Sequence, residues 1–494
     1  MPLLLAIDQS TSATKVLLFD ENGRALDQVS RDHRQFYPEP GWVEHDAEEI
    51  WQNTLAAARE LMDRHSARRA EIAGVSISNQ RETIVVFDRT SGAPLHPAIV
   101  WQCRRGDPLC AAQLSAGREA GIRTRTGLRV DSYFSASKLQ WLIRERPEIA
   151  RRLADGTARV GTIDAYLIHR LTGGSVFATD HTNACRTLLF DIDRLDWDDE
   201  LCAWWNVPRS ALPQVRPSGA RFGATTLGGA LPAPVPICGV MGDSQAALFA
   251  QGCFEAGTAK ATFGTGTSLL LNVGARRPAA AGGSVCTIGW VLDDQPAYVL
   301  EGIITFSAAT LTWLRDQLGL INDPAETEAL ARAVPDNGGV YLVPAFSGLG
   351  APHWRESARG AIVGLTAHSD RRHIVRAGLE SIAFQVSDVV DMMRVEGGLA
   401  LRRLQADGGA TANRFLMQLV ADLTGVELRV AGSPHYSPLG AAMMGMLGLG
   451  LQPSLAALAA LPRDGQTYQP KLERAEVGQL RAGWRRAVRQ VMTE

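Results

Sequence analysis

The sequence has few of the features that mark secreted, zinc-binding or membrane-spanning proteins. Its seven cysteines are scattered, odd in number and without CxxC spacing, which argues for reduced thiols and against a structural zinc site. The apolar run before Asp8 has only five residues and no basic segment ahead of it, unlike a signal peptide. No window of about twenty residues is apolar enough to span a bilayer. We therefore expect a soluble, cytoplasmic protein without a membrane span.

Charge of one sign is also not in excess. The chain carries 50 Lys and Arg against 52 Asp and Glu, a formal net charge of −2. Such a balance does not favour a nucleic acid or a membrane surface as partner, so we expect a small-molecule ligand and no nucleic acid. The 46% of hydrophobic residues is ordinary for a soluble globular enzyme.

The length of the chain predicts more than one domain, because 494 residues exceed what a single hydrophobic core usually organises. Two strand–polar turn–strand patterns occur, at 3–19 and at 259–273, which suggests a duplicated α/β architecture. We place the boundary at 245–260 and expect domains at 1–250 and 251–494. Further elements are predicted at these positions: a strand at 25–29, a helix at 47–64 capped by Asp46, a helix at 137–153, a strand at 237–241, and a helix through Phe415 and Leu419.

The sequence lacks the GxxxxGK[ST] motif, so a P-loop is excluded. A protein that handles ATP must then neutralise the triphosphate with another small-residue turn, a cation and a metal. The segment 8–15 fits this need, with Asp8 at the end of a strand for Mg²⁺ or its waters, four hydroxyl residues, and Lys15 as the cation. The alternative is a polar hairpin turn in which Asp8 only satisfies backbone groups.

Two further small-residue turns are candidates for phosphate or nucleotide contacts. Gly264-Thr265-Gly266-Thr267-Ser268 lies between two predicted strands, and Asp407-Gly408-Gly409-Ala410-Thr411-Ala412-Asn413 lies between a strand and a helix. Taken singly, each is explained as well by an ordinary glycine turn. Three such turns at the ends of strands together favour a nucleotide site.

Other residues have the chemistry to hold and activate a hydroxyl acceptor. Asp243 follows a predicted strand and opens a helical run, as either a general base or a helix N-cap. Arg81 and Glu82 are adjacent in what reads as an exposed turn, where they form a surface ion pair or grip vicinal hydroxyls. Trp101 could supply an apolar wall and Tyr133 a hydroxyl, although both residue types also occur in ordinary cores.

Long strings of the sequence resemble the FGGY family of carbohydrate kinases, and within it the branch that phosphorylates glycerol. The resemblance runs nearly end to end. It is carried by Pro40-Gly41-Trp42-Val43-Glu44-His45-Asp46, Asn79-Gln80-Arg81-Glu82-Thr83, Ala98-Ile99-Val100-Trp101-Gln102-Cys103-Arg104-Arg105, Thr182-Asn183-Ala184 with Arg186-Thr187, Pro344-Ala345-Phe346 with Gly348-Leu349-Gly350-Ala351-Pro352, and Leu379-Glu380-Ser381-Ile382-Ala383.

The resemblance implies an α/β fold of two actin-like ATPase (ribonuclease H-like) domains with ATP in the cleft between them. It implies Mg²⁺- and ATP-dependent phosphorylation of glycerol to glycerol 3-phosphate, with Asp243 as the base. The implied nucleotide-binding residues are Thr11, Ser12, Ala13, Lys15, Thr265, Ala308, Thr312, Gly409 and Asn413. The implied metal-binding residues are Asp8 and Asp243, and the implied polyol-binding residues are Arg81, Glu82, Trp101, Tyr133, Asp243, Ser244 and Ser268.

The sequence departs from the glycerol-phosphorylating branch at several positions. Lys15 stands where that branch generally has Arg, and Ala308 and Thr312 stand where the family usually has Gly and Gln. Ser244 and Ser268 replace a Gln and a Phe. The last two changes make the acceptor pocket roomier and more polar, so a tetritol, a pentitol or a xylulose-like ketose is the alternative acceptor.

Two further expectations concern inhibition by a sugar phosphate and the class of protein to which the chain belongs. Some relatives bind fructose 1,6-bisphosphate through a Gly-Gly loop that ends in Arg. The stretch 228–233 has no basic residue, so we expect weak or absent inhibition by that sugar. A non-catalytic ATP-driven switch protein is a third hypothesis, but such a protein has no use for a complete polyol-binding set. A homodimer and a homotetramer are both compatible with the sequence.

Overall fold

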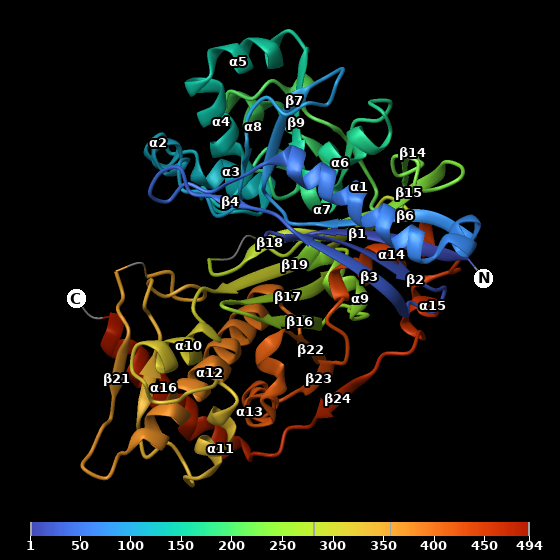
Figure 1. The fold of residues 1–494 in the computed structure, drawn as a ribbon. Coiled ribbons are helices and arrows are strands. Elements are labelled where there is room, and N and C mark those ends of the chain that lie inside the picture. The colour runs from blue at the N-terminus through green and yellow to red at the C-terminus, as the bar shows by residue number, and fades with distance from the viewer. Residues whose placement is uncertain (1, 280–281, 356, 493–494) are drawn as a thin grey trace.

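The computed structural model describes residues 2–279, 282–355 and 357–492. The chain forms two α/β halves, each organised around a large mixed sheet (Figure 1). In this view the N-terminal half, blue to green, lies above the C-terminal half, yellow to red, and the two sheets approach each other at the centre. The α/β fold expected from the sequence is therefore present.

The first sheet has the strand order β14-β15-β6-β1-β2-β3. Its strands are β1 (Leu3–Gln9), β2 (Ala13–Phe19), β3 (Ala25–Asp32), β6 (Ile72–Asn79), β14 (Arg221–Thr225) and β15 (Val235–Gly242). β1, β2 and β3 form an antiparallel meander, β6 adds in parallel beside β1, and β15 adds in parallel beside β6. β1 is buried along its whole length, which explains its continuous apolar run.

The second sheet repeats this arrangement. Its order is β18-β19-β17-β16-β22-β23-β24, with β16 (Thr258–Phe263), β17 (Thr267–Gly274), β18 (Val285–Leu292), β19 (Gln295–Ile304), β22 (Arg403–Asp407), β23 (Glu427–Ala431) and β24 (Gly465–Tyr468). β16, β17 and β19 are antiparallel, while β22 and β23 add in parallel beside β16. The repeated pattern is what a duplicated α/β architecture requires.

Two predicted helices have different outcomes. Helix α1 (Ala47–Arg64) has the predicted bounds, and the Asp46 carboxylate caps it by accepting from the Glu48 and Glu49 amides. The single helix predicted at 137–153 is wrong, because it is two helices, α4 (Ser135–Glu145) and α5 (Pro147–Ala154). Proline lacks an amide hydrogen and disfavours helical backbone in the preceding residue, so the break falls at Arg146.

Helix α14 (Tyr436–Gly448) connects the two halves. It belongs to the C-terminal part of the chain but packs on β1, β6 and β15 of the first sheet and on helix α9 (Asp243–Ala250). A Cβ atom at Gly440 would lie 1.8 Å from the Ala246 carbonyl oxygen, and one at Gly445 would lie 2.3 Å from Ser76 Oγ. The glycines of this apolar run therefore permit close packing of α14 against the first half.

A five-stranded sheet, β4-β5-β8-β7-β9, lies in the N-terminal half. The other helices are α2 (Asp107–Ser115), α3 (Glu119–Thr126), α6 (Ile163–Leu171), α7 (His181–Ala184), α8 (Asp199–Trp204), α10 (Ala309–Asp316), α11 (Glu326–Arg332), α12 (Arg371–Gly397), α13 (Arg414–Thr424), α15 (Leu455–Ala459) and α16 (Arg474–Met492), with 3₁₀ turns at Ser66–Glu71, Arg209–Ala211 and Gly409–Ala412. The other strands are β4 (Gln35–Phe36), β5 (Glu44–His45), β7 (Ile84–Asp88), β8 (Ala98–Ile99), β9 (Ala158–Thr162), β10 (Ala178–Asp180), β11 (Phe190–Asp191), β12 (Asp196–Trp197), β13 (Gln214–Arg216), β20 (Tyr341–Val343) and β21 (Ala361–Val363). Within the described residues, no helix combines the length and the apolar character needed to cross a membrane.

Candidate functional site

A cavity of about 790 Å³ lies where the two halves meet. Its wall combines the end of β1 and the first turns of α9 with β16, β17, β19, the turn after β22 and the segment 431–438. Eleven of the residues predicted from the sequence line it: Asp8, Thr11, Lys15, Arg81, Glu82, Trp101, Tyr133, Asp243, Ser244, Ser268 and Gly409. Candidate acceptor residues and candidate phosphate residues thus share one cavity.

Asp8 is held at the end of β1. Its carboxylate accepts a hydrogen bond of 2.7 Å from Ser78 Oγ on β6, the parallel neighbour of β1. Burial raises the pKa of Asp8 to about 6, although Ser78 and the nearby Lys15 both act in the opposite direction. A buried carboxylate that is costly to ionise gains most from a cation placed beside it.

Two side chains, Trp101 and His33, hold Thr11 in the turn that follows β1. Trp101 Nε1 donates to Thr11 Oγ1 at 3.0 Å, and His33 Nε2 lies 2.9 Å from the Thr11 carbonyl oxygen. The Trp101 and Tyr133 rings pack edge to face with their centroids 5.3 Å apart. Trp101 is therefore both an aromatic wall of the cavity and a hydrogen-bond partner of the predicted phosphate turn.

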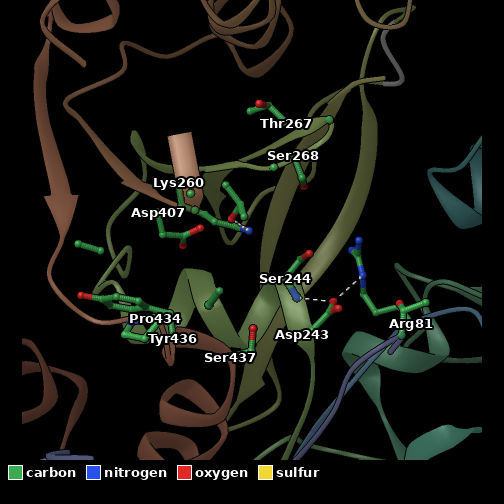
Figure 2. A pocket seen from close by; sticks show the side chains of 18 of the residues that line it. Arg81, Asp243, Ser244, Lys260, Thr267, Ser268, Asp407, Pro434, Tyr436 and Ser437 are labelled. Carbon is green, nitrogen blue, oxygen red and sulfur yellow. Dashed lines mark hydrogen bonds and ion pairs between the residues drawn. The ribbon is translucent and has the colours of Figure 1, made fainter. Parts of the chain in front are cut away.

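Asp243 opens helix α9 and faces the cavity (Figure 2). Gly242, not Asp243, is the N-cap residue of this helix. Asp243 Oδ1 accepts from the Ser244 amide at 2.6 Å and lies 3.3 Å from Arg81 Nε. Its side chain is 37% exposed, so one face of the carboxylate is available to a ligand.

The sequence predicts Arg81 and Glu82 in an exposed turn, but both residues are buried, with 6% and 1% of their surface exposed. Glu82 has φ of 63°, in the left-handed region. Arg81 Nη2 pairs with Glu301 Oε1 at 3.0 Å, whereas Arg81 Nε is 4.0 Å from Glu82 Oε1. The predicted surface ion pair between these neighbours is therefore wrong, because both side chains lie in the wall of the cavity.

Arg81, Glu82, Arg186 and Glu301 form a buried group that we call the interdomain charge cluster. Arg186 Nε lies 2.6 Å from Glu82 Oε1, and Arg186 Nη1 lies 2.6 Å from Glu301 Oε2. Burial by itself raises the pKa of Glu301, but Arg186 and Arg81 outweigh it and lower that pKa to about 2. Glu301 comes from β19 in the second half, so this cluster joins the halves through charge.

Sequence reasoning missed several polar residues of the second half. Lys260, Thr262 and Glu301 line the cavity although no sequence pattern had singled them out. Figure 2 shows Lys260 beside Asp407, which belongs to the predicted turn 407–413, across the cavity from Ser244. The signal that could have found Lys260 is a lone charge inside a buried, otherwise uncharged strand, Thr258–Phe263. Nothing local to Glu301 indicates its partners, which are 115 to 220 residues away.

Six residues predicted to bind nucleotide lie outside the cavity lining: Ser12, Ala13, Thr265, Ala308, Thr312 and Asn413. Thr265 and Ala308 are close to each other, because the Ala308 and Ala309 amides donate to the Gly264 and Thr265 carbonyls at the start of α10. Asn413 caps α13, accepting from the Leu416 amide at 2.9 Å. These contacts give Thr265, Ala308 and Asn413 structural roles. The proposed contacts of all six residues with the nucleotide stay predictions.

A metal site made by protein side chains alone is not found in the part of the chain that the structure describes, where no three His, Cys, Asp or Glu residues are arranged to hold an ion. Asp8 and Asp243 could bind a metal only together with ligands that the protein does not supply. Mg²⁺ commonly binds in this way, through one or two carboxylates and substrate phosphates.

A two-domain α/β protein with acidic and basic groups converging on a cavity between its halves, and with small-residue turns at strand ends, has the architecture of a phosphoryl-transfer enzyme. Comparison with known proteins identifies the family. The model of the FGGY carbohydrate kinase N-terminal domain matches residues 3–250, and that of the C-terminal domain matches residues 259–449. The chain belongs to the FGGY family of carbohydrate kinases.

Within this family, the chain is similar to several proteins named glycerol kinase. The chain is 47% identical to a glycerol kinase of Symbiobacterium thermophilum, over 98% of this chain and 97% of the relative. It is 44% identical to glycerol kinase 1 of Thermotoga maritima, over 99% and 100%. A Plasmodium falciparum glycerol kinase crystallised with ADP superimposes with a TM-score of 0.95 and 36% identity, over 100% and 99% of the two chains.

Proposed function

We propose that this enzyme transfers the γ-phosphoryl group of ATP to glycerol and so makes glycerol 3-phosphate. The observation that carries the proposal is the single cavity in which Asp243 and Arg81 face Lys15, Thr11 and the Gly408-Gly409 turn. Relatives named glycerol kinase that are 42–47% identical over nearly the whole chain support the same acceptor. A cytoplasmic location follows from the proposed use of cellular ATP.

Asp243 is the proposed base. The acceptor hydroxyl attacks the γ-phosphorus, a new O–P bond forms, the bond from the γ-phosphorus to the β,γ-bridging oxygen breaks, and Asp243 takes the hydroxyl proton. Because phosphoryl-transfer transition states are loose, orienting the hydroxyl matters more than early proton removal. The Ser244 amide, 2.6 Å from Asp243 Oδ1, fixes the carboxylate for this purpose.

The remaining acceptor contacts are assigned by chemistry. Arg81 donates and Glu82 accepts, so the pair suits two adjacent hydroxyls of a polyol. The Trp101 face covers the carbon chain, and the hydroxyl of Tyr133, whose pKa is raised by burial, remains protonated. Ser244 and Ser268 complete this wall of the cavity.

The nucleotide is proposed to lie along the second half. Thr11, Ser12, Ala13 and Lys15 would surround its phosphates from the first half, and Thr265 from the second. Gly409, which lines the cavity, would contact adenosine. Asn413, Ala308 and Thr312 would contact it after a movement of their segments toward the cavity. Domains at 1–250 and 251–494 are consistent with a nucleotide bound between them.

Asp8 and Asp243 are the residues that would hold Mg²⁺. The buried Asp8 carboxylate, whose pKa is raised to about 6 by burial, fits a cation that compensates its charge. When bound, the ion would screen the phosphate oxygens during transfer.

A larger acceptor is the second candidate, and one observation favours it. Ser268 Oγ is buried and meets no hydrogen-bond partner among the described residues. An unpaired buried hydroxyl is costly, so a further acceptor hydroxyl would find a partner there. A four- or five-carbon polyol or a xylulose-like ketose could supply that hydroxyl.

A substrate panel separates these possibilities. ADP release is followed by a coupled assay with glycerol, erythritol, xylitol, ribitol and xylulose, each with ATP and Mg²⁺. Glycerol is expected to give the highest kcat/KM. Turnover of a larger polyol without turnover of glycerol would contradict the proposal, and an absence of acceptor-stimulated ATP consumption would contradict both candidates.

A further inference from the structure

Lys260 is a buried cation in the cavity wall to which no role has been assigned. It lies on β16, where alternate residues face opposite sides of the sheet. Ala259, Ala261 and Phe263 pack into the hydrophobic core, so Lys260 and Thr262 point to the other face and reach the cavity. The strand therefore presents Lys260 to the space where the phosphates are proposed to lie.

The ammonium group of Lys260 is under-satisfied. The residue is 1% exposed, and Nζ donates one hydrogen bond of 2.7 Å, to Thr262 Oγ1. Among the described residues, no carboxylate forms an ion pair with it. An ammonium has three donors, and burying one without a paired anion is costly. The free donors are thus available to an anion in the cavity.

Lysine is rare in this chain, so a lysine in the cavity wall is an unusual feature. Only four of the 50 basic residues are lysines, at positions 15, 138, 260 and 471. Two of these four, Lys15 and Lys260, line the same cavity from opposite halves. Lysine is a compact point charge that binds phosphate without the planar geometry of arginine.

The second phosphate turn lies close to Lys260 along the chain and across the sheet. β16 runs directly into Gly264-Thr265-Gly266, and Thr262 pairs with Ser268 on β17 and with Asp407 on β22. Figure 2 shows Lys260 reaching into the cavity between Asp407 and Ser268. Burial lowers the pKa of Lys260, while the carboxylates of Asp407 and Asp243 act against this.

We propose that Lys260 binds the β- and γ-phosphate oxygens of the nucleotide from the second half, opposite Lys15. This inference rests on the proposed function for its ligand and extends it with a second phosphate-binding cation. Lys260 takes no proton in the reaction. It stabilises the charge that shifts onto the leaving phosphate as the bond from the γ-phosphorus to the bridging oxygen breaks.

Nucleotide affinities provide the test, because they need no acceptor. Calorimetry with AMP-PNP, ADP and AMP, each with Mg²⁺, is carried out on wild-type protein, Lys260→Met and Lys260→Gln. Removing a charge-assisted contact is expected to weaken AMP-PNP binding by about ten- to a hundredfold. ADP is expected to lose less, and AMP to stay within about twofold, because it has neither phosphate.

Controls separate this role from a structural one. Lys471→Met makes the same chemical change at an exposed position of the second half and should leave all three affinities unchanged. Lys260→Gln keeps a donor for Thr262, so it remains informative if Lys260→Met unfolds, and thermal melting reports the fold of each variant. Lys260→Arg, which keeps the charge, should recover part of the AMP-PNP affinity.

The outcomes are distinct. Equal weakening of all three nucleotides, or unchanged AMP-PNP binding, would overturn the proposal for Lys260. A wild-type enzyme that binds AMP-PNP but does not turn over glycerol would instead contradict the proposed acceptor, and the order of the three affinities would still decide the role of Lys260.

Discussion

Asp243 is the residue on which the proposed chemistry depends most. Asp243→Asn keeps the size of the side chain and the hydrogen bond from the Ser244 amide but cannot take a proton. We expect turnover to fall by about 10²-fold or more, while AMP-PNP affinity stays largely intact. The measurements are steady-state kinetics and calorimetry on the same preparation.

A matched control for this variant is Asp199→Asn. Asp199 also stands at the first position of a helix, α8, but its side chain is 79% exposed and is not part of the cavity lining. Loss of a first-turn charge alone should leave turnover unchanged there. If Asp243→Asn behaved like Asp199→Asn, the carboxylate at 243 would serve only the helix.

Asp8 offers a test of the proposed metal site. Asp8→Asn retains an oxygen for the hydrogen bond from Ser78 but removes the negative charge. The Mg²⁺ concentration that gives half-maximal turnover should rise by roughly tenfold or more, because a charged contact is lost. Titrating Mg²⁺ at saturating ATP and acceptor measures this, and an unaltered metal dependence would count against Asp8 as a ligand.

The residues of the proposed acceptor site could be predicted from the sequence, whereas their burial and their ion-pair partners could not. Arg81 and Glu82 were identified as a donor and an acceptor, yet they were expected at the surface because adjacent opposite charges usually lie there. Their burial depends on Arg186 and Glu301, which are more than 100 positions away in the chain. Pairings of this kind arise only from the fold.

At the scale of elements, the interdomain charge cluster links β19 to the first half. Glu301→Gln leaves Arg186 with Glu82 as its one carboxylate partner and Arg81 with Glu82 and the partly exposed Asp243. Removing one member of a buried ion pair typically costs about 3–5 kcal/mol, so a clear loss of thermal stability is expected. The KM for the acceptor should also rise, because Arg81 loses the partner 3.0 Å away that fixes its position.

A double variant checks that this loss comes from unpaired charge. Arg186→Met with Glu301→Gln removes a cation and an anion together, so its melting temperature should fall by less than the sum of the two single changes. Strictly additive losses, or a single Glu301→Gln variant that melts like the wild type, would show that the cluster does not stabilise the fold.

Helix α6 contributes a pH dependence of stability. Asp164 accepts from Thr162 Oγ1 and Thr179 Oγ1, each at 2.6 Å, and burial raises its pKa from 3.8 to about 7, with Asp180 acting in the same direction. Between these values the folded protein binds more protons than the unfolded chain, so this group makes stability fall as pH rises from about 4 to about 7.

Asp164→Asn should remove that contribution, which is of the order of a few kcal/mol for a shift of this size. Urea unfolding midpoints at pH 5 and pH 8 measure it. The wild type is expected to lose more stability between these pH values than the variant does. Parallel changes in the two proteins would mean that Asp164 does not titrate in this range.

The errors in the predicted elements have both local and distant causes. The helix expected at 137–153 overlooked Pro147, which is a local signal and could have been used. The need for glycine at 440 and 445 could not be predicted, because it arises from the backbone of Ala246 and the side chain of Ser76, which are distant in the chain. The two-sheet repeat was predictable because its hydrophobic runs and polar turns are local.

At the scale of the whole molecule, the cavity is lined by residues of both halves. Contacts across it include α14 packed on the first sheet and Glu301 paired with Arg81 and Arg186. Predicted nucleotide residues such as Thr312 and Asn413 lie outside the cavity lining. A closing movement of the halves would bring these segments nearer to a bound nucleotide.

We expect acceptor and nucleotide together to favour a more compact molecule. Closure excludes water from the γ-phosphate and limits hydrolysis of ATP in the absence of an acceptor. Small-angle X-ray scattering should show a smaller radius of gyration with AMP-PNP, Mg²⁺ and glycerol together than with any one of them, and the Glu301→Gln variant should close less completely. An identical radius in all states would show that the two halves keep one relative position, and residues outside the cavity lining would then have no route to the nucleotide.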